Sequence, residues 1–170
     1  LGTRLRPLTE FRAKPAMPVR GRPVISLLLD FLARQGCREV MINLHHLRDS
    51  IRSAIAADHP PGIEIHWSEE STPLGTGGGI RRAADFLRES EACIVRAGDM
   101  LIDRPLKELF ERHLASGRQA TLLLREDSRD ARFGSIGVDA TGRVNRIGPM
   151  RLTGFADRKA KGADPIEKAQ

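Results

Sequence analysis

Residues suited to holding a polyphosphate stand together at the start of the chain. The first four residues are Leu1, Gly2, Thr3 and Arg4, and Lys14 follows shortly after them. Because glycine has no side chain, a phosphate group can approach the backbone amides near Gly2 closely. The Thr3 hydroxyl adds a donor, and the two cations can neutralise phosphate charge from two directions. This opening stretch therefore favours a binding site for a nucleoside triphosphate.

A second candidate loop runs from residue 69 to residue 79. Four of its last five residues are glycines, beginning at Gly75, and Thr76 is the exception. Bare backbone of this kind lets a flat base or a phosphate lie against the chain, close to the free amides of the helix that follows. A surface loop without a ligand is the alternative interpretation, because a run of glycines is a weak signal by itself.

An acidic residue supplies the third candidate. Asp99 follows Gly98 just after the apolar segment 92–97. A carboxylate at the end of a strand can bind Mg²⁺, a hard cation that keeps several water ligands and bridges to phosphates. A turn or a helix cap is the alternative role for a single aspartate in this position.

Alternating helices and strands are predicted to position these groups. Helices are predicted at 23–35, 47–57, from the glycine run to about 87 and at 104–116, and strands at 38–44, 63–67, 92–97 and 120–125. Residues 133–147 are typical of a hairpin around Thr141-Gly142. This alternation predicts an α/β fold with a largely parallel sheet covered on both faces. Since ligands bind at the carboxyl ends of such strands, we expect the three loops to converge at one edge.

Length and composition narrow the classes of protein. A chain of 170 residues is long enough for one domain with a core. The formal net charge is +6, but the arginines are spread out and aromatic residues make up only 4%, which argues against nucleic-acid binding. A membrane-spanning helix needs about 18 or more consecutive apolar residues, and no apolar run in the chain approaches that length. No membrane partner is therefore expected. Cys37 and Cys93 are expected to be buried free thiols in a reducing cytoplasm.

The motifs occur in an order that resembles the sugar-1-phosphate nucleotidyltransferases, also called nucleoside-diphosphate-sugar pyrophosphorylases. The resemblance covers about residues 1–147 and is carried by G-T-R-L-R-P-L-T from Gly2, A-K-P around Lys14, the glycine-rich loop and Gly98-Asp99. It implies a Rossmann-like three-layer α/β/α sandwich with a mostly parallel, mixed sheet. The chain is similar to bacterial mannose-1-phosphate guanylyltransferases and N-acetylmuramate-1-phosphate uridylyltransferases, which leaves both guanine and uracil open.

The resemblance also implies a reaction, in which a nucleoside triphosphate and a sugar 1-phosphate form an NDP-sugar and pyrophosphate with Mg²⁺ as cofactor. As catalytic residues, Arg4 would brace the leaving pyrophosphate and Lys14 would lie between the α-phosphate and the sugar phosphate. Asp99 would hold the metal. Glu70, five residues before Gly75, would read the edge of the base. The implied nucleotide-binding residues are Leu1, Gly2, Thr3, Glu70, Gly75 and Thr76.

Several features depart from the family pattern. In the family a strand and a glycine-rich turn precede the opening run, a proline usually occupies the position of Ala13, and a second metal carboxylate lies beyond the matching residues. We therefore expect 1–150 to form a nucleotidyltransferase catalytic domain without its first strand. Residues 151–170 have few apolar side chains and are expected to form a divergent, poorly ordered tail. A catalytically silent nucleotide-binding regulatory subunit, or a truncated fragment, is the alternative to an active enzyme, and assembly into a homo-oligomer is left open.

Overall fold

The computed structural model describes residues 5–125 and 135–152. The predictions made for Leu1, Gly2, Thr3 and Arg4, and those for 153–170, therefore lie outside the described residues. The chain divides into two compact units, Leu1–Pro105 and Leu106–Gln170. Helices and strands occur together in both units, which confirms the α/β class.

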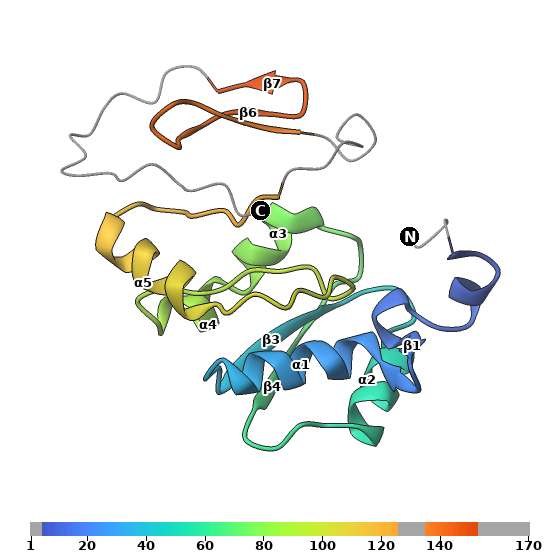
Figure 1. The fold of residues 1–170 in the computed structure, drawn as a ribbon. Coiled ribbons are helices and arrows are strands. Elements are labelled where there is room, and N and C mark those ends of the chain that lie inside the picture. The colour runs from blue at the N-terminus through green and yellow to red at the C-terminus, as the bar shows by residue number, and fades with distance from the viewer. Residues whose placement is uncertain (1–4, 126–134, 153–170) are drawn as a thin grey trace. The chain divides into compact units, whose positions relative to one another are not determined.

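The first unit opens with short elements and continues with alternating helices and strands (Figure 1). The short elements are the 3₁₀ helices η2 (Leu8–Glu10) and η3 (Lys14–Ala16) and the antiparallel strands β1 (Pro18–Val19) and β2 (Arg22–Pro23). They are followed by α1 (Val24–Arg34), β3 (Glu39–Leu44), α2 (Arg48–Ala57), β4 (Glu64–Glu69), α3 (Gly75–Arg82) and α4 (Ala84–Arg88). The predicted helices and strands between residues 23 and 69 are confirmed to within one or two residues.

Strands β3 and β4 pair in parallel, with Glu39 opposite Glu64 and Leu44 opposite Glu69. Because parallel strands run in the same direction, both carboxyl ends reach the same edge of the sheet. The backbone N–H of Glu70 continues the ladder by donating to the Leu44 carbonyl at 2.8 Å. The last residues of β3 and the loop after β4 are therefore fixed beside each other.

Helix α1 supplies the largest share of the core of the first unit. Ile25, Leu28, Leu29 and Leu32 recur at three- and four-residue intervals, so they lie on one face of the helix, and all are buried. The helix packs against α2, η3 and β2. Leu44 at the end of β3 is also completely buried, so the core extends to the edge where the candidate loops begin.

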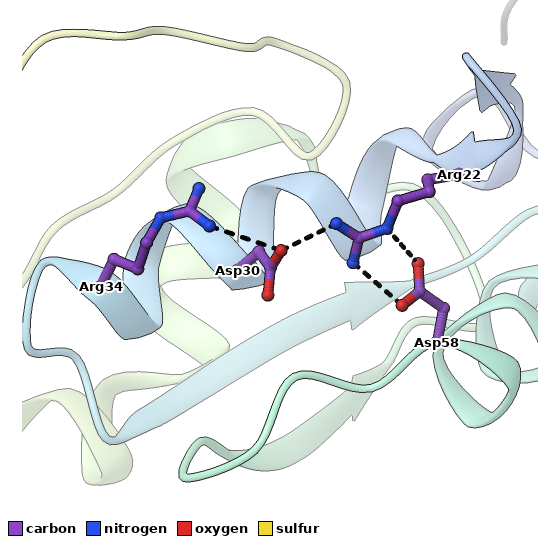
Figure 2. A network of polar contacts seen from close by, with 4 residues as sticks. All are labelled: Arg22, Asp30, Arg34 and Asp58. Carbon is purple, nitrogen blue, oxygen red and sulfur yellow. Dashed lines mark hydrogen bonds and ion pairs between the residues drawn. The ribbon is translucent and has the colours of Figure 1, made fainter.

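A network of four charged side chains ties β2, α1 and the end of α2 together (Figure 2). The Arg22 guanidinium donates to both carboxylate oxygens of Asp58, at 2.8 and 2.9 Å, and to Asp30 at 2.8 Å. Arg34 reaches the same oxygen of Asp30 at 3.5 Å. The hydrogen bonds from Arg22 hold the pKa of Asp58 below its ordinary value of 3.8.

Replacing Arg22 with methionine is expected to lower the melting temperature at neutral pH and to flatten its dependence on acid. A carboxyl whose folded-state pKa is depressed stabilises the fold above its unfolded-state pKa and loses that contribution as pH falls through the folded value. The wild-type chain should therefore lose more stability than Arg22→Met between about pH 5 and pH 2. Arg34→Met is the control, because Arg34 makes a single longer contact and should change the acid profile less. Parallel acid profiles for Arg22→Met and wild type would contradict the assignment.

The second unit contains α5 (Lys107–Ser116) and a small antiparallel sheet. Its strands are β5 (Ile136–Val138), β6 (Val144–Ile147) and β7 (Met150–Arg151), paired in the order β5-β6-β7 within the described residues. The Asp139 carboxylate accepts hydrogen bonds from the backbone of Thr141 and Arg143 and from the Thr141 hydroxyl, which shapes the turn. The hairpin predicted around Thr141-Gly142 is confirmed.

Two predicted strands do not form. Residues 92–97 and 120–125 carry no ladder partner in the described part of the chain, and Ile94, Val95, Leu122 and Leu123 are exposed. Apolar runs create strand propensity, but a strand exists only where a neighbouring chain supplies its hydrogen bonds. The parallel sheet of the described residues is consequently the β3–β4 pair, smaller than predicted.

Two further expectations from composition can be compared with the structure. Both cysteines are free thiols, but Cys93 is exposed and Cys37 only half-buried, so the expectation that both are buried is wrong. Burial raises the pKa of the Cys37 thiol. Among the described residues, the helices are too short or too polar to cross a membrane.

Candidate functional site

The first unit brings two of the predicted catalytic and metal-binding residues together. The Nζ of Lys14 lies 2.5 Å from Oδ2 of Asp99, and both side chains stay partly exposed. A Cβ at the neighbouring Gly98 would lie 3.6 Å from the Pro15 ring and 3.8 Å from Ile25, so η3 and α1 pack closely beneath the aspartate loop. An ammonium and a carboxylate therefore lie together at one solvent-accessible position.

Lys14 is held in place by the residues on either side of it. The backbone N–H of Ala13 donates to the Ser50 hydroxyl at 2.9 Å, and that hydroxyl donates to the Leu47 carbonyl at 2.7 Å. Ala13 and Ala16 are both buried, so η3 is pinned against the start of α2. A proline at position 13 would have no N–H to donate. The departure of Ala13 from the family pattern thus provides an anchoring hydrogen bond.

The loop that carries Asp99 is braced by Arg96. Its guanidinium lies over the Phe31 ring, 5.6 Å from the centroid, and Nη2 donates to the Met100 carbonyl at 2.5 Å. Burial lowers the pKa of this guanidinium. Arg96 was not predicted from the sequence, because its role depends on the contact with α1, and the periodicity of the sequence does not reveal that contact.

Glu70 lies at the start of the second candidate loop, directly after β4. Its Oε1 accepts from the Asn43 amide Nδ2 at 3.1 Å, and its Oε2 accepts from the backbone N–H of Leu74 at 3.1 Å. The Glu70 carbonyl lies 2.9 Å from His45 Nδ1. The predicted base-reading carboxylate is therefore fixed between the end of β3 and the residue that precedes α3.

The glycine run forms the first turns of a helix rather than a free loop. Helix α3 begins at Gly75, whose φ of +70° is a conformation that favours glycine, and Thr76 and Gly77 follow in its exposed first turn. The backbone N–H groups of such a turn have no partner within the helix and carry its positive dipole end. Gly75 and Thr76 are thus placed where a helix offers amides to an anion or a base.

The first unit also contains an open hollow of about 330 Å³. Its lining residues are Arg6, Thr9, Glu10, His45 and His46. The lining is polar and includes both a cationic and an acidic side chain, so it is suited to a polar group. Arg6 is not among the site residues predicted from the sequence.

The predicted residues thus fall into two described groups, both in the first unit. Lys14 and Asp99 form one group, and Glu70, Gly75 and Thr76 form the other. Within residues 5–125 and 135–152, no set of three or more histidine, cysteine, aspartate or glutamate side chains could hold a metal ion. Asp99 is the predicted metal ligand that lies in this part of the chain.

Comparisons with known proteins indicate the family of the chain. A family model described as nucleotidyl transferase matches residues 1–148. The chain is 33% identical over 143 residues to a mannose-1-phosphate guanylyltransferase from Mycobacterium tuberculosis, covering 84% of this chain and 40% of that protein. It is 29% identical over 148 residues to the mannose-1-phosphate guanylyltransferase catalytic subunit beta of Drosophila melanogaster, covering 86% of this chain and 40% of that one. The chain spans about two fifths of the length of these relatives.

A solved structure is similar in fold as well. The crystal structure of HddC from Yersinia pseudotuberculosis complexed with GMP-PN matches with a TM-score of 0.71 and 28% identity, covering 82% of this chain and 60% of that one.

Proposed function

Because the chain belongs to the nucleotidyl transferase family, we propose that it is the nucleotide-binding part of a sugar-1-phosphate nucleotidyltransferase. The reaction joins a nucleoside triphosphate to a sugar 1-phosphate and yields an NDP-sugar and pyrophosphate. The observation that carries the proposal is the meeting of Lys14 and Asp99 at 2.5 Å beside the α1–η3 packing. The proposal includes a three-layer α/β/α sandwich with a larger sheet than the β3–β4 pair. The TM-score of 0.71 to HddC supports this part of the proposal.

The proposed chemistry is an in-line displacement at phosphorus. An oxygen of the sugar 1-phosphate attacks the α-phosphorus of the triphosphate, a new P–O bond forms, and the bond to the β-phosphate oxygen breaks as pyrophosphate leaves. The protein contributes position and charge neutralisation rather than covalent chemistry. Lys14 neutralises the α-phosphate and the sugar phosphate, Arg4 braces the pyrophosphate, and Leu1, Gly2 and Thr3 line the phosphate turn.

Asp99 fits the requirements of a Mg²⁺ ligand. Its carboxylate is a hard oxygen donor and its side chain is 30% exposed, so a cation bound there can keep water and phosphate ligands. When bound, Mg²⁺ would neutralise charge on the phosphates. Asp99 would hold the cation, and Lys14 would neutralise charge on the same phosphates.

Guanine is the base we propose, with mannose 1-phosphate as the first sugar to test. Two relatives are named as mannose-1-phosphate guanylyltransferases, and the HddC crystal carries a guanine nucleotide. A carboxylate such as Glu70 accepts from N–H groups, which guanine presents as adjacent donors. UTP, with one ring N–H, is the alternative. We also propose a cytoplasmic enzyme that acts on small molecules rather than on nucleic acid or membranes, with assembly into homo-oligomers to be measured by light scattering.

A second candidate function is triphosphate binding without turnover, as in a regulatory subunit. The single carboxylate at the Asp99 position favours it, because no cluster of metal ligands occurs in the described residues. The two functions differ in their products, since only the enzyme releases pyrophosphate.

The deciding experiment is a pyrophosphate-release assay on the protein expressed from its complete gene. GTP, UTP, ATP and dTTP are each combined with mannose, glucose and N-acetylmuramate 1-phosphates, and NDP-sugar is identified by mass spectrometry. Release with GTP and mannose 1-phosphate is expected. A protein that binds GTP but turns over no pair would support the regulatory alternative, and one that binds no triphosphate would overturn both.

Replacing Asp99 with asparagine is expected to raise the Mg²⁺ concentration needed for half-maximal pyrophosphate release. Loss of an outer-shell partner of a metal site costs about 10–100-fold in affinity or activity, and a direct ligand should cost at least as much. The measurement is a Mg²⁺ titration of the initial rate. Asp85→Asn removes the same charge from a fully exposed side chain and should leave the titration unchanged. An unaltered Mg²⁺ requirement in Asp99→Asn would remove Asp99 from the metal site.

A further inference from the structure

We propose that Asn43 is a positioning residue that fixes the Glu70 carboxylate and thereby helps to select the base. The inference rests on the proposed role of Glu70 in reading the base. Asn43 was not a candidate in the sequence analysis, and its place in the structure is what assigns it this role.

The parallel register of β3 and β4 brings the two side chains together. Asn43 is the penultimate residue of β3, and Glu70 follows the last residue of β4, which pairs with Leu44. Asn43 Nδ2 donates to Glu70 Oε1, and the Leu74 N–H donates to Glu70 Oε2, both at 3.1 Å. The backbone of Glu70 is also fixed through Leu44 and His45. One donor on each oxygen prevents the carboxylate from turning about its last bond.

Gly79 leaves the space that this arrangement needs. A Cβ at this position would overlap the Asn43 amide nitrogen and would lie 3.1 Å from Glu70 Oε1. Gly79 is buried in helix α3, and its backbone lies directly against the Asn43 amide. Any larger residue would push the amide away from the carboxylate.

A fixed carboxylate has a specific use in recognition. An ionised carboxylate offers about four lone-pair sites, and Asn43 and Leu74 use two of them. The remaining sites can accept from two neighbouring N–H donors on one edge of a base, and such paired hydrogen bonds require a fixed orientation. Guanine offers two adjacent donors and uracil offers one. Loss of the Asn43 hydrogen bond should therefore weaken guanine binding more than uracil binding.

The test compares variants of the same chain by two measurements, and the urea unfolding midpoint of each variant reports its stability. The first measurement is the Kd of GTP and of UTP, each with Mg²⁺, and the second is amide hydrogen exchange at Leu74. Asn43→Asp keeps the size of the side chain but places a second carboxylate next to that of Glu70. This variant should bind GTP about tenfold more weakly, as expected for the loss of one hydrogen bond to a charged group. UTP binding should change less, and Leu74 should exchange faster.

Three further variants separate positioning from stability. Asn43→Asp combined with Glu70→Gln exchanges donor and acceptor, so it should restore slow exchange at Leu74 without restoring the preference for GTP. Gly79→Ala should lower the GTP preference although alanine favours helix formation over glycine. Asn145→Asp makes the same chemical change in β6 and should alter neither measurement.

Two results would overturn the inference. One is an Asn43→Asp chain with the Leu74 exchange rate and the GTP-to-UTP ratio of the wild type. The other is equal weakening of both nucleotides together with a lower unfolding midpoint, which is what a merely structural role would give. If the wild-type chain bound neither triphosphate, the proposed function and the base selection would both fail, while Leu74 exchange would still report whether Asn43 positions Glu70.

Discussion

Replacing Lys14 with methionine should slow pyrophosphate release by about 10²–10³-fold, the loss seen when one preorganised donor is removed from a developing anionic charge. Methionine keeps a long unbranched side chain but removes the ammonium that we place between the two phosphates. The rate is measured at saturating GTP and mannose 1-phosphate, so that weaker binding does not hide the effect on the chemical step.

The same substitution should leave the fold intact. Lys14 and Asp99 are 41% and 30% exposed, and an ion pair at that exposure contributes little to stability. Thermal unfolding is therefore expected to change little. Lys107→Met, which removes an exposed lysine of α5, is the control for both measurements. A fully active Lys14→Met enzyme would exclude Lys14 from the mechanism.

Replacing Leu29 with alanine should destabilise the protein by about 2–5 kcal/mol, the usual range for a leucine removed from a packed core. Leu29 is 1% exposed, and α1 carries the packing against α2, η3 and β2. Urea unfolding measures the change in the free energy of unfolding. Leu8→Ala is the matched control, because Leu8 is 58% exposed and should cost far less. Equal losses for both variants would mean that α1 does not form the core.

Local sequence patterns predicted the helices and the parallel strands β3 and β4 between residues 23 and 69, and also the later hairpin. The spacing of Ile25, Leu28, Leu29 and Leu32 indicates one buried helix face, and the structure has that face in α1. The hairpin of β5 and β6 follows from turn chemistry within five residues of Asp139. The segments 92–97 and 120–125 have similar apolar character, but they are not strands in the structure. Strand formation there would need hydrogen bonds from a neighbouring strand, which the apolar pattern of the segment itself does not provide.

Candidate site residues could be chosen from the sequence where the side chain itself carries the relevant charge. Lys14 and Asp99 were identified from charge, position and motif order, and they meet in the structure. Asn43 and Arg96 act through other residues, Glu70 and the Met100 carbonyl respectively. Their roles depend on strand register and on packing against α1, which no short sequence pattern contains. Residues that hold a site in place are thus harder to predict from the sequence than the residues that form it.

The Ala13–Ser50 hydrogen bond has an evolutionary consequence. With alanine at position 13, the backbone N–H needs the Ser50 hydroxyl as its acceptor. With proline at position 13, there is no such donor, and position 50 no longer needs a hydroxyl for this purpose. The two positions should therefore change together among related sequences, so that a hydroxyl or other short acceptor at position 50 accompanies a residue other than proline at position 13.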